Sequence, residues 1–204
     1  LRMRTSSQEA HTKAESSPFV TNLMRGGLSL SDYSLYLANL AFIYDELEKQ
    51  TGAGDPLPSS DQLWDARLNR SERIQKDLIA LGLTDWRETV TPTAGTIAYV
   101  ERLAELAGQS DARTIAHHYT RYLGDLSGGQ AIAALVARNY GATEEQLTFY
   151  QFPDLENLVR YKESYREVLD NLELSVAEQA ALIEEVSIAF ELNQRMFDEL
   201  HVAS

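Results

Sequence analysis

The chain has 204 residues, of which 44% are apolar and 24% are charged, and this balance excludes a fibrous or disordered protein. Because domains hold roughly 100 to 200 residues, the length predicts a single domain over residues 1–204. The net charge of −13 argues against nucleic acid as a partner, and the absence of Cys excludes disulfides, thiolate-held metals and Cys nucleophiles.

Helical periodicity extends over nearly the whole sequence, and no stretch shows the strict alternation of a half-buried strand. The predicted fold class is therefore all-α. In chain order, the expected helices span residues 4–15, 19–25, 31–50, 71–81, 93–107, 111–140, 154–172 and 176–201. Residues 51–60, which hold two Gly and two Pro, are expected to form a surface loop and not a boundary between domains.

Short polar residues mark several of the expected helix starts, because their side chains accept hydrogen bonds from free backbone N–H groups. Ser31 with Asp32 is expected to cap the long helix over residues 31–50, and Ser71 is expected to cap the helix after the loop. Two further pairs have the spacing of a capping box, namely Thr143 with Gln146 and Ser175 with Glu178.

Residues 122–130, inside the longest expected helix, are unusually poor in helix-forming residues, although helical periodicity continues on both sides. Each interior Gly costs about 0.5–1 kcal/mol relative to Ala. Gly124 and Gly128 share one face, where missing side chains would let a flat ligand approach the backbone. Spacing alone also allows close contact with a second helix, or a break into two helices. Asp125 favours the ligand, because a carboxylate at a helix bend can organise water.

His11 lies on the expected first helix, where a lone His is more often a surface or core residue than a ligand. Two neighbours favour a ligand. Glu15 lies one turn on and could orient the imidazole, and Arg4 lies two turns earlier, where it could meet an anionic group of the bound molecule. His117 and His118 are adjacent and cannot share one ion, so we expect one to pack and the other to face solvent.

A helical chain rich in carboxylates also raises the possibility of a di-iron bundle. That site requires Glu-x-x-His on two helices, and no Glu in this sequence is followed by His at the third position. The di-iron class is therefore excluded.

The segment around the Gly cluster and the segment around His11 resemble the haem-contacting helices of the haem oxygenases. Residues 119–130 (YTRYLGDLSGGQ) resemble the distal-helix motif of that family, and residues 10–15 (AHTKAE) resemble its proximal-helix motif. The resemblance continues in the family's order through residues 68–70, 76–78, 149–152, 161–162, 165–166, Phe190, Asn193 and Phe197. It implies an all-α bundle that holds haem between a proximal N-terminal helix and a bent, Gly-rich distal helix.

The resemblance implies a role for each matched residue near the iron. His11 is expected to be the proximal iron ligand, with Glu15 supporting its neutral imidazole. Gly124 and Gly128 are expected to contact the porphyrin, and Asp125 to act through ordered water as the distal proton source.

Further positions match the family around this centre. Tyr44 and Arg121 extend the distal network, and Tyr119 lies beside it. The cations that match propionate-binding positions are Arg4, Lys162 and Arg166, where Arg4 stands at a position that is Lys in many relatives. On the last helix, Phe190 and Asn193 match positions that contribute to the haem pocket.

The implied activity is cleavage of haem at a meso carbon, expected to be the alpha carbon, to biliverdin, carbon monoxide and ferrous iron. Haem would be both substrate and cofactor, with O2 and with electrons from a ferredoxin, a flavodoxin or a reductase. A non-catalytic haem carrier would not need Asp125, Tyr44 and Arg121 together, and a structural bundle would bind no haem. The joint presence of the three residues favours the enzyme.

The sequence contains no run of 18 apolar residues, and its first residues lack the apolar core of a signal peptide. We therefore expect a cytoplasmic protein with no membrane anchor, and a monomer is the default state. Iron acquisition, haem detoxification and pigment supply all stay open as its biological purpose.

Overall fold

The computed structural model describes residue 12 and residues 16–49, 63–107 and 112–203, and these ranges contain helices and no strand. The all-α prediction is therefore confirmed. The α-helices are α3 (Pro18–Arg25), α4 (Leu30–Lys49), α5 (Ser71–Ala80), α6 (Trp86–Thr89), α7 (Ala94–Leu106), α8 (Arg113–His118), α9 (Gly124–Tyr140), α10 (Leu158–Asp170) and α11 (Val176–Ala203). The 3₁₀ turns are η2 (Ala66–Leu68), η4 (Glu144–Gln146) and η5 (Thr148–Tyr150), and η3 (Tyr119–Leu123) is a π-helical turn.

Two expected segments lie outside the described residues. They are the first helix, over residues 4–15, apart from Thr12, and the loop over residues 51–60. None of the described helices is both long enough and apolar enough to cross a membrane.

Helix α4 begins differently from the prediction. Its cap is Ser29, whose hydroxyl accepts the Asp32 N–H at 3.1 Å, while the Asp32 carboxylate accepts the Ser29 N–H at 2.7 Å. This is a capping box, in which Asp32 is the third helical residue and Ser31 takes no part. The prediction of Ser31 as a cap was wrong because a second Ser, two residues earlier, has the correct spacing to Asp32.

The start of α5 also corrects the prediction, because Ser71 is the first residue of the helix and not its cap. The carboxylate of Glu48, on α4, accepts the backbone N–H groups of Arg70 and, at 3.1 Å, of Ser71. A side chain from another helix therefore satisfies the free N–H groups that a local cap would otherwise satisfy. By contrast, the capping boxes at Thr143 and Ser175 are present as predicted.

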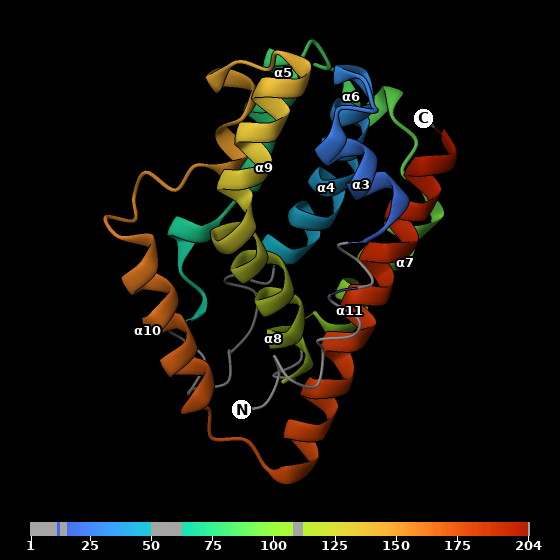
Figure 1. The fold of residues 1–204 in the computed structure, drawn as a ribbon. Helices are drawn as coiled ribbons and strands as arrows, with labels where there is room; N and C mark the ends of the chain where they lie inside the picture. The colour runs from blue at the N-terminus through green and yellow to red at the C-terminus, as the bar shows by residue number, and fades with distance from the viewer. Residues whose placement is uncertain (1–11, 13–15, 50–62, 108–111, 204) are drawn as a thin grey trace.

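The longest expected helix continues through the Gly cluster as predicted, so the alternative of a break into two helices is excluded. α8, η3 and α9 form one continuous helical run, the distal run, which is bent along its length in Figure 1. It ends at Gly141, which has the left-handed φ of 70° that closes many helices. The π-helical turn lies directly before Gly124, and such turns are common at functional sites.

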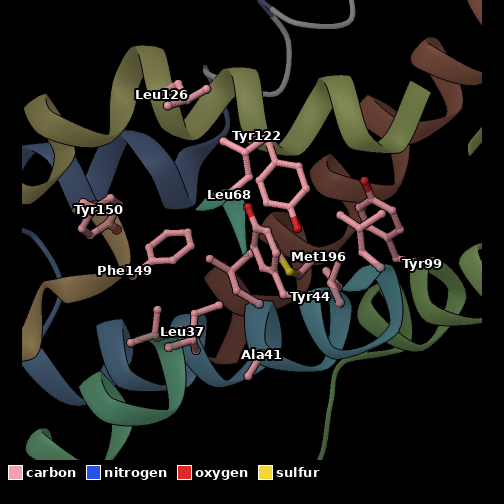
Figure 2. Packing of buried hydrophobic residues seen from close by; sticks show 14 of the residues in the cluster. Leu37, Ala41, Tyr44, Leu68, Tyr99, Tyr122, Leu126, Phe149, Tyr150 and Met196 are labelled. Atoms are coloured by element: carbon pink, nitrogen blue, oxygen red, sulfur yellow. The ribbon is translucent and has the colours of Figure 1, made fainter. Parts of the chain in front are cut away.

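Helix α4 forms the centre of the core and is buried along most of its length. It packs against α5 and α7, whereas α11 packs along α7, α8 and α3. Figure 2 shows Tyr44 of α4 and Tyr122 of the distal run pointing into the same cluster, with ring centroids 5.8 Å apart. This packing holds the distal run against α4.

Helix α10 is shorter than the expected 154–172. It begins after Asn157, whose side chain accepts the Arg160 N–H at 3.0 Å, and it ends at Asp170. The residues before Asn157 continue from η5 without helical structure. Figure 1 shows α10 at the edge of the molecule, to one side of the distal run.

Gly95 gives a test of the packing between α7 and α11. A Cβ at this position would lie 2.6 Å from the backbone N of Met196 and 2.9 Å from the carbonyl carbon of Arg195. We therefore expect Gly95→Ala to lower the free energy of unfolding by about 1–3 kcal/mol, because two backbones must separate. Urea denaturation measures this change. Gly27→Ala is the control, since its Cβ would make only ordinary contacts at 3.6 Å or more. Equal effects of the two changes would contradict a close helix contact at Gly95.

Candidate functional site

A buried polar network joins α4, the distal run and α11. The carboxylate of Asp125, in the first turn of α9, accepts a hydrogen bond from the Tyr44 hydroxyl. Arg121 donates through Nε to the Tyr44 oxygen at 3.2 Å and through Nη1 to the Asn193 side-chain oxygen at 2.5 Å. The structure therefore brings together four of the residues that the sequence predicted, from three separate helical segments.

The local structure explains why these side chains meet. Arg121 lies in the π-helical turn η3, and its side chain points into the core, where its exposed fraction is 8%. Asn193 is fixed by its own helix, because its side-chain N–H donates to the Ala189 carbonyl at 2.9 Å. The guanidinium also lies over the Tyr44 ring, 5.1 Å from its centroid. Both partners of Arg121 are thus held in place before any ligand binds.

The electrostatics of the network leave Asp125 able to gain and lose a proton near neutral pH. Burial raises the pKa of Asp125 to about 6, while the charge of Arg121 and the hydrogen bond from Tyr44 oppose that rise. Burial also raises the pKa of Tyr44 well above its ordinary value, so its hydroxyl stays protonated and remains a donor. For Arg121, burial lowers the pKa, but Tyr44 and Asp125 outweigh it and keep the guanidinium charged.

The three clustered glycines face in two directions. A Cβ built on Gly124 or Gly128 would meet no described atom within 4 Å, whereas one on Gly129 would lie 3.1 Å from Cδ1 of Tyr150. Gly129 therefore packs against the core, and among the described residues Gly124 and Gly128 leave the opposite face of the helix open. Among the described residues, no second helix packs against Gly124 or Gly128, so the alternative of a close helix contact at these glycines is not borne out. The open face beside Asp125 fits a flat ligand.

Comparison with known proteins agrees with this geometry. The family model described as Heme oxygenase matches residues 1–199. The chain belongs to the haem oxygenase family. It is 32% identical over 200 residues to Heme oxygenase 1 of Nostoc, covering 98% of this chain and 84% of that protein. It is 33% identical over 201 residues to Heme oxygenase 1 of Gallus gallus, covering 97% of this chain and 68% of that protein.

A solved structure gives the same result for the fold. Heme oxygenase-1 from Synechocystis, in complex with heme, matches with a TM-score of 0.93 and 29% identity, over 99% of this chain and 91% of that one. The predicted fold of the haem oxygenase type is therefore confirmed. The expected proximal residues, His11, Glu15 and Arg4, lie outside the described residues, so their roles stay predictions.

The structure also describes the remaining positions that match the haem oxygenases. Lys162 and Arg166, four residues apart on α10, are half-buried and exposed, respectively. Within the described ranges, neither forms an ion pair. Tyr119 in η3 and Phe190 on α11 are half-buried and pack against the core. These placements leave both cations able to bind an anion.

The expectation that His117 or His118 faces solvent was wrong, because both are buried, with exposed fractions of 0% and 1%. His117 Nε2 lies 3.0 Å from Oε1 of Glu185, which is also paired with Arg102. His118 Nδ1 lies 2.8 Å from the Tyr165 hydroxyl of α10. Protein covers α8 on two sides, so neighbouring positions on it both lie in the interior.

Sequence reasoning missed two tyrosines that surround Arg121. Burial raises the pKa of Tyr36 and of Tyr99, and the Arg121 charge opposes part of that rise, so that both pKa values are about 12. These two hydroxyls therefore lie within the electrostatic reach of the guanidinium. Tyr36 lies about two turns before Tyr44 on α4, and its spacing alone places it on the apolar face of that helix. The high Tyr content, 10 residues against 6 Phe, was the available signal for a polar interior.

Tyr44→Phe should raise the pKa of Asp125 further above about 6, because the Tyr44 hydroxyl stabilises the charged carboxylate. A titration of the Asp125 carboxyl carbon by ¹³C NMR measures the change. Tyr122→Phe is the matched control, since its hydroxyl donates to Glu48 at 3.1 Å instead. An Asp125 pKa that falls or stays unchanged in Tyr44→Phe would contradict the role of this hydrogen bond.

Proposed function

We propose that this protein is a haem oxygenase that uses O2 and electrons to cleave haem to biliverdin, carbon monoxide and ferrous iron. The single observation that carries the proposal is the buried network of Asp125, Tyr44 and Arg121 beside the open face of Gly124 and Gly128. A haem carrier needs the open face but has no use for a half-buried carboxylate whose pKa is raised to about 6. Membership of the haem oxygenase family supports the same reaction.

The described residues fit a bound haem. Gly124 and Gly128 leave room for a flat macrocycle to lie against the backbone of the distal run. His11, supported by Glu15, would bind the iron as a neutral imidazole. When bound, haem supplies both the iron centre that reacts with O2 and the carbon skeleton that is oxidised. The protein has to orient the macrocycle and control proton delivery.

Asp125 controls proton delivery in this proposal. Its carboxyl group, with a pKa of about 6, holds a proton or releases it to ordered water at small cost near neutral pH. The Tyr44 hydroxyl and the Arg121 guanidinium fix the direction of the carboxylate, and Asn193 fixes Arg121. Because each group is held by the next, the proton source keeps its position relative to the open face.

Lys162 and Arg166 would bind the two carboxylates of haem, together with Arg4. Charge-assisted hydrogen bonds of this kind fix the rotation of the macrocycle in its plane. That rotation decides which meso carbon lies nearest the oxygen site, and we propose the alpha carbon. Tyr119 and Phe190 would line the same pocket.

We further propose that the protein is a single-domain monomer of the cytoplasm. Its electrons would come from a ferredoxin, a flavodoxin or a reductase. The products suit iron acquisition, haem detoxification or pigment supply equally well.

Asp125→Ala should bind haem but form biliverdin at least about a hundredfold more slowly, because general acid catalysis contributes about 10²–10⁴-fold. Absorbance spectra during turnover with haem, O2 and an electron donor measure both properties. Glu145→Gln is the control, since Glu145 is an exposed carboxylate outside the network. Normal biliverdin formation by Asp125→Ala would refute the role of the carboxylate. Loss of the haem spectrum without biliverdin in the unmodified protein would refute the proposed reaction.

Gly128→Ala should weaken haem binding about tenfold or more without destabilising the haem-free protein. The new methyl group would meet no described atom within 4 Å but would occupy the proposed position of the macrocycle. Haem titration measures the affinity, and urea denaturation measures the free energy of unfolding. Gly27→Ala serves as the control for both measurements. Unchanged haem affinity would show that the macrocycle does not lie against this face.

A further inference from the structure

Helix α10, which carries Lys162 and Arg166, is loosely attached to the rest of the described structure. Within the described ranges it forms no extended packing interface with another helix, and Figure 1 shows it at the edge of the molecule. Its buried side chains are Tyr165 and Leu169. Among the described residues, α10 is therefore held by side-chain contacts, to which Leu158, Tyr161 and Val168 also contribute by packing against the core.

Two side-chain hydrogen bonds between described residues join α10 to other segments. The Tyr161 hydroxyl donates to the Asp65 carboxylate at 2.9 Å. The Tyr165 hydroxyl lies 2.8 Å from Nδ1 of His118, which is the last residue of α8. Tyr161 and Tyr165 are four residues apart and therefore lie on one face of α10.

His118 is held firmly within the distal run. Its ring is parallel to that of Tyr165 within 9°, at a centroid distance of 5.8 Å. Trp64 packs edge-on against it at 4.7 Å, and Tyr122 packs at 4.5 Å. Burial lowers the pKa of His118 to about 3, so the imidazole is neutral, and its Nε2 has no described partner. The hydrogen bond between the Tyr165 hydroxyl and Nδ1 thus offsets part of the free-energy cost of burying the polar imidazole of His118.

The position of Tyr165 determines where the two cations of α10 point. Lys162 and Arg166 each follow one of the two tyrosines directly in the sequence, and successive helical residues are about 100° apart around the axis. Any rotation of α10 about its axis therefore turns both cations together. His118 and Asp125 belong to the same continuous run, so the contact also fixes α10 relative to the proton source.

We propose that the contact between His118 and Tyr165 positions α10 so that Lys162 and Arg166 meet the two haem carboxylates in one orientation. The contact would thereby select the meso carbon that is oxidised. His118 and Tyr165 are positioning residues, because they act through the two cations. This inference rests on the proposed function.

Tyr165→Phe tests the proposal by removing one hydroxyl and keeping the ring. Haem affinity should fall about 2- to 10-fold, the range for one lost hydrogen bond. Affinity for haem dimethyl ester, whose carboxylates are neutralised, should not change. The biliverdin formed by the variant should contain isomers that the unmodified protein does not form in quantity. Absorbance titration and chromatography of the product measure these changes.

Variants of His118 distinguish positioning from general damage. His118→Leu should behave like Tyr165→Phe, and the double variant should be no worse than either, because both changes remove one contact. His118→Asn should restore part of the effect, since its amide places a polar group near the position of Nδ1. Tyr140→Phe is the matched control, because its hydroxyl also joins two helices, donating to the Leu23 carbonyl at 2.7 Å.

Three results would overturn the inference. If Tyr165→Phe leaves both the haem affinity and the isomer ratio unchanged, the contact does not position α10. Equal weakening for haem and for its ester would indicate general loosening of the pocket. Full additivity in the double variant would mean that the residues act separately. If Tyr165→Phe does not fold, as judged by circular dichroism, His118→Asn and His118→Leu provide the same comparison. If the unmodified protein forms no biliverdin, the proposed function itself is refuted, whatever the variants show.

Discussion

The site depends on one buried charge, the guanidinium of Arg121. A charge in the interior is stable only when it is paired and hydrogen-bonded, and here its partners are the Tyr44 hydroxyl and the Asn193 amide. Tyr44 passes this interaction on to Asp125. Because the folded protein must satisfy the buried guanidinium, its hydrogen bonds hold the distal run, α4 and α11 together. The same hydrogen bonds fix the direction of the Asp125 carboxylate through Tyr44. Stability and the preorganisation of the site have one physical origin.

Helix α4 supplies the polar side chains that arrange the elements around it. The side-chain oxygen of Asn39 accepts hydrogen bonds from the backbone N–H of Thr93 and from the hydroxyl of Thr96, at the start of α7. Glu48 caps α5. Tyr44, between them along the helix, contacts the distal run. A helix buried on almost all sides can use polar residues in this way only where each one finds a partner. The neighbours of α4 are thus positioned by specific hydrogen bonds as well as by apolar packing.

The elements that sequence reasoning predicted correctly are those governed by local rules. The continuity of the distal run followed from periodicity on both sides of its glycines, and the capping box at Ser175 followed from spacing. Two of the errors have non-local causes. Glu48 caps α5 from 22 residues away in the chain. His118 is buried because α10, far along the sequence, lies over it. The error at Ser31 is local, because Ser29 lies three residues before Asp32, which is the spacing of a capping box.

By itself, the sequence determined the helical class, the conspicuous glycines, the resemblance to the haem oxygenases and the residue types of the distal network, because these depend on composition, periodicity and motif. Only the tertiary structure decided that Gly129 packs inward while Gly124 and Gly128 leave a face open. It also decided that burial raises the pKa of Asp125 to about 6, and that His118 meets Tyr165. Such properties depend on what surrounds a residue, and those surroundings come from segments that lie far apart in the chain.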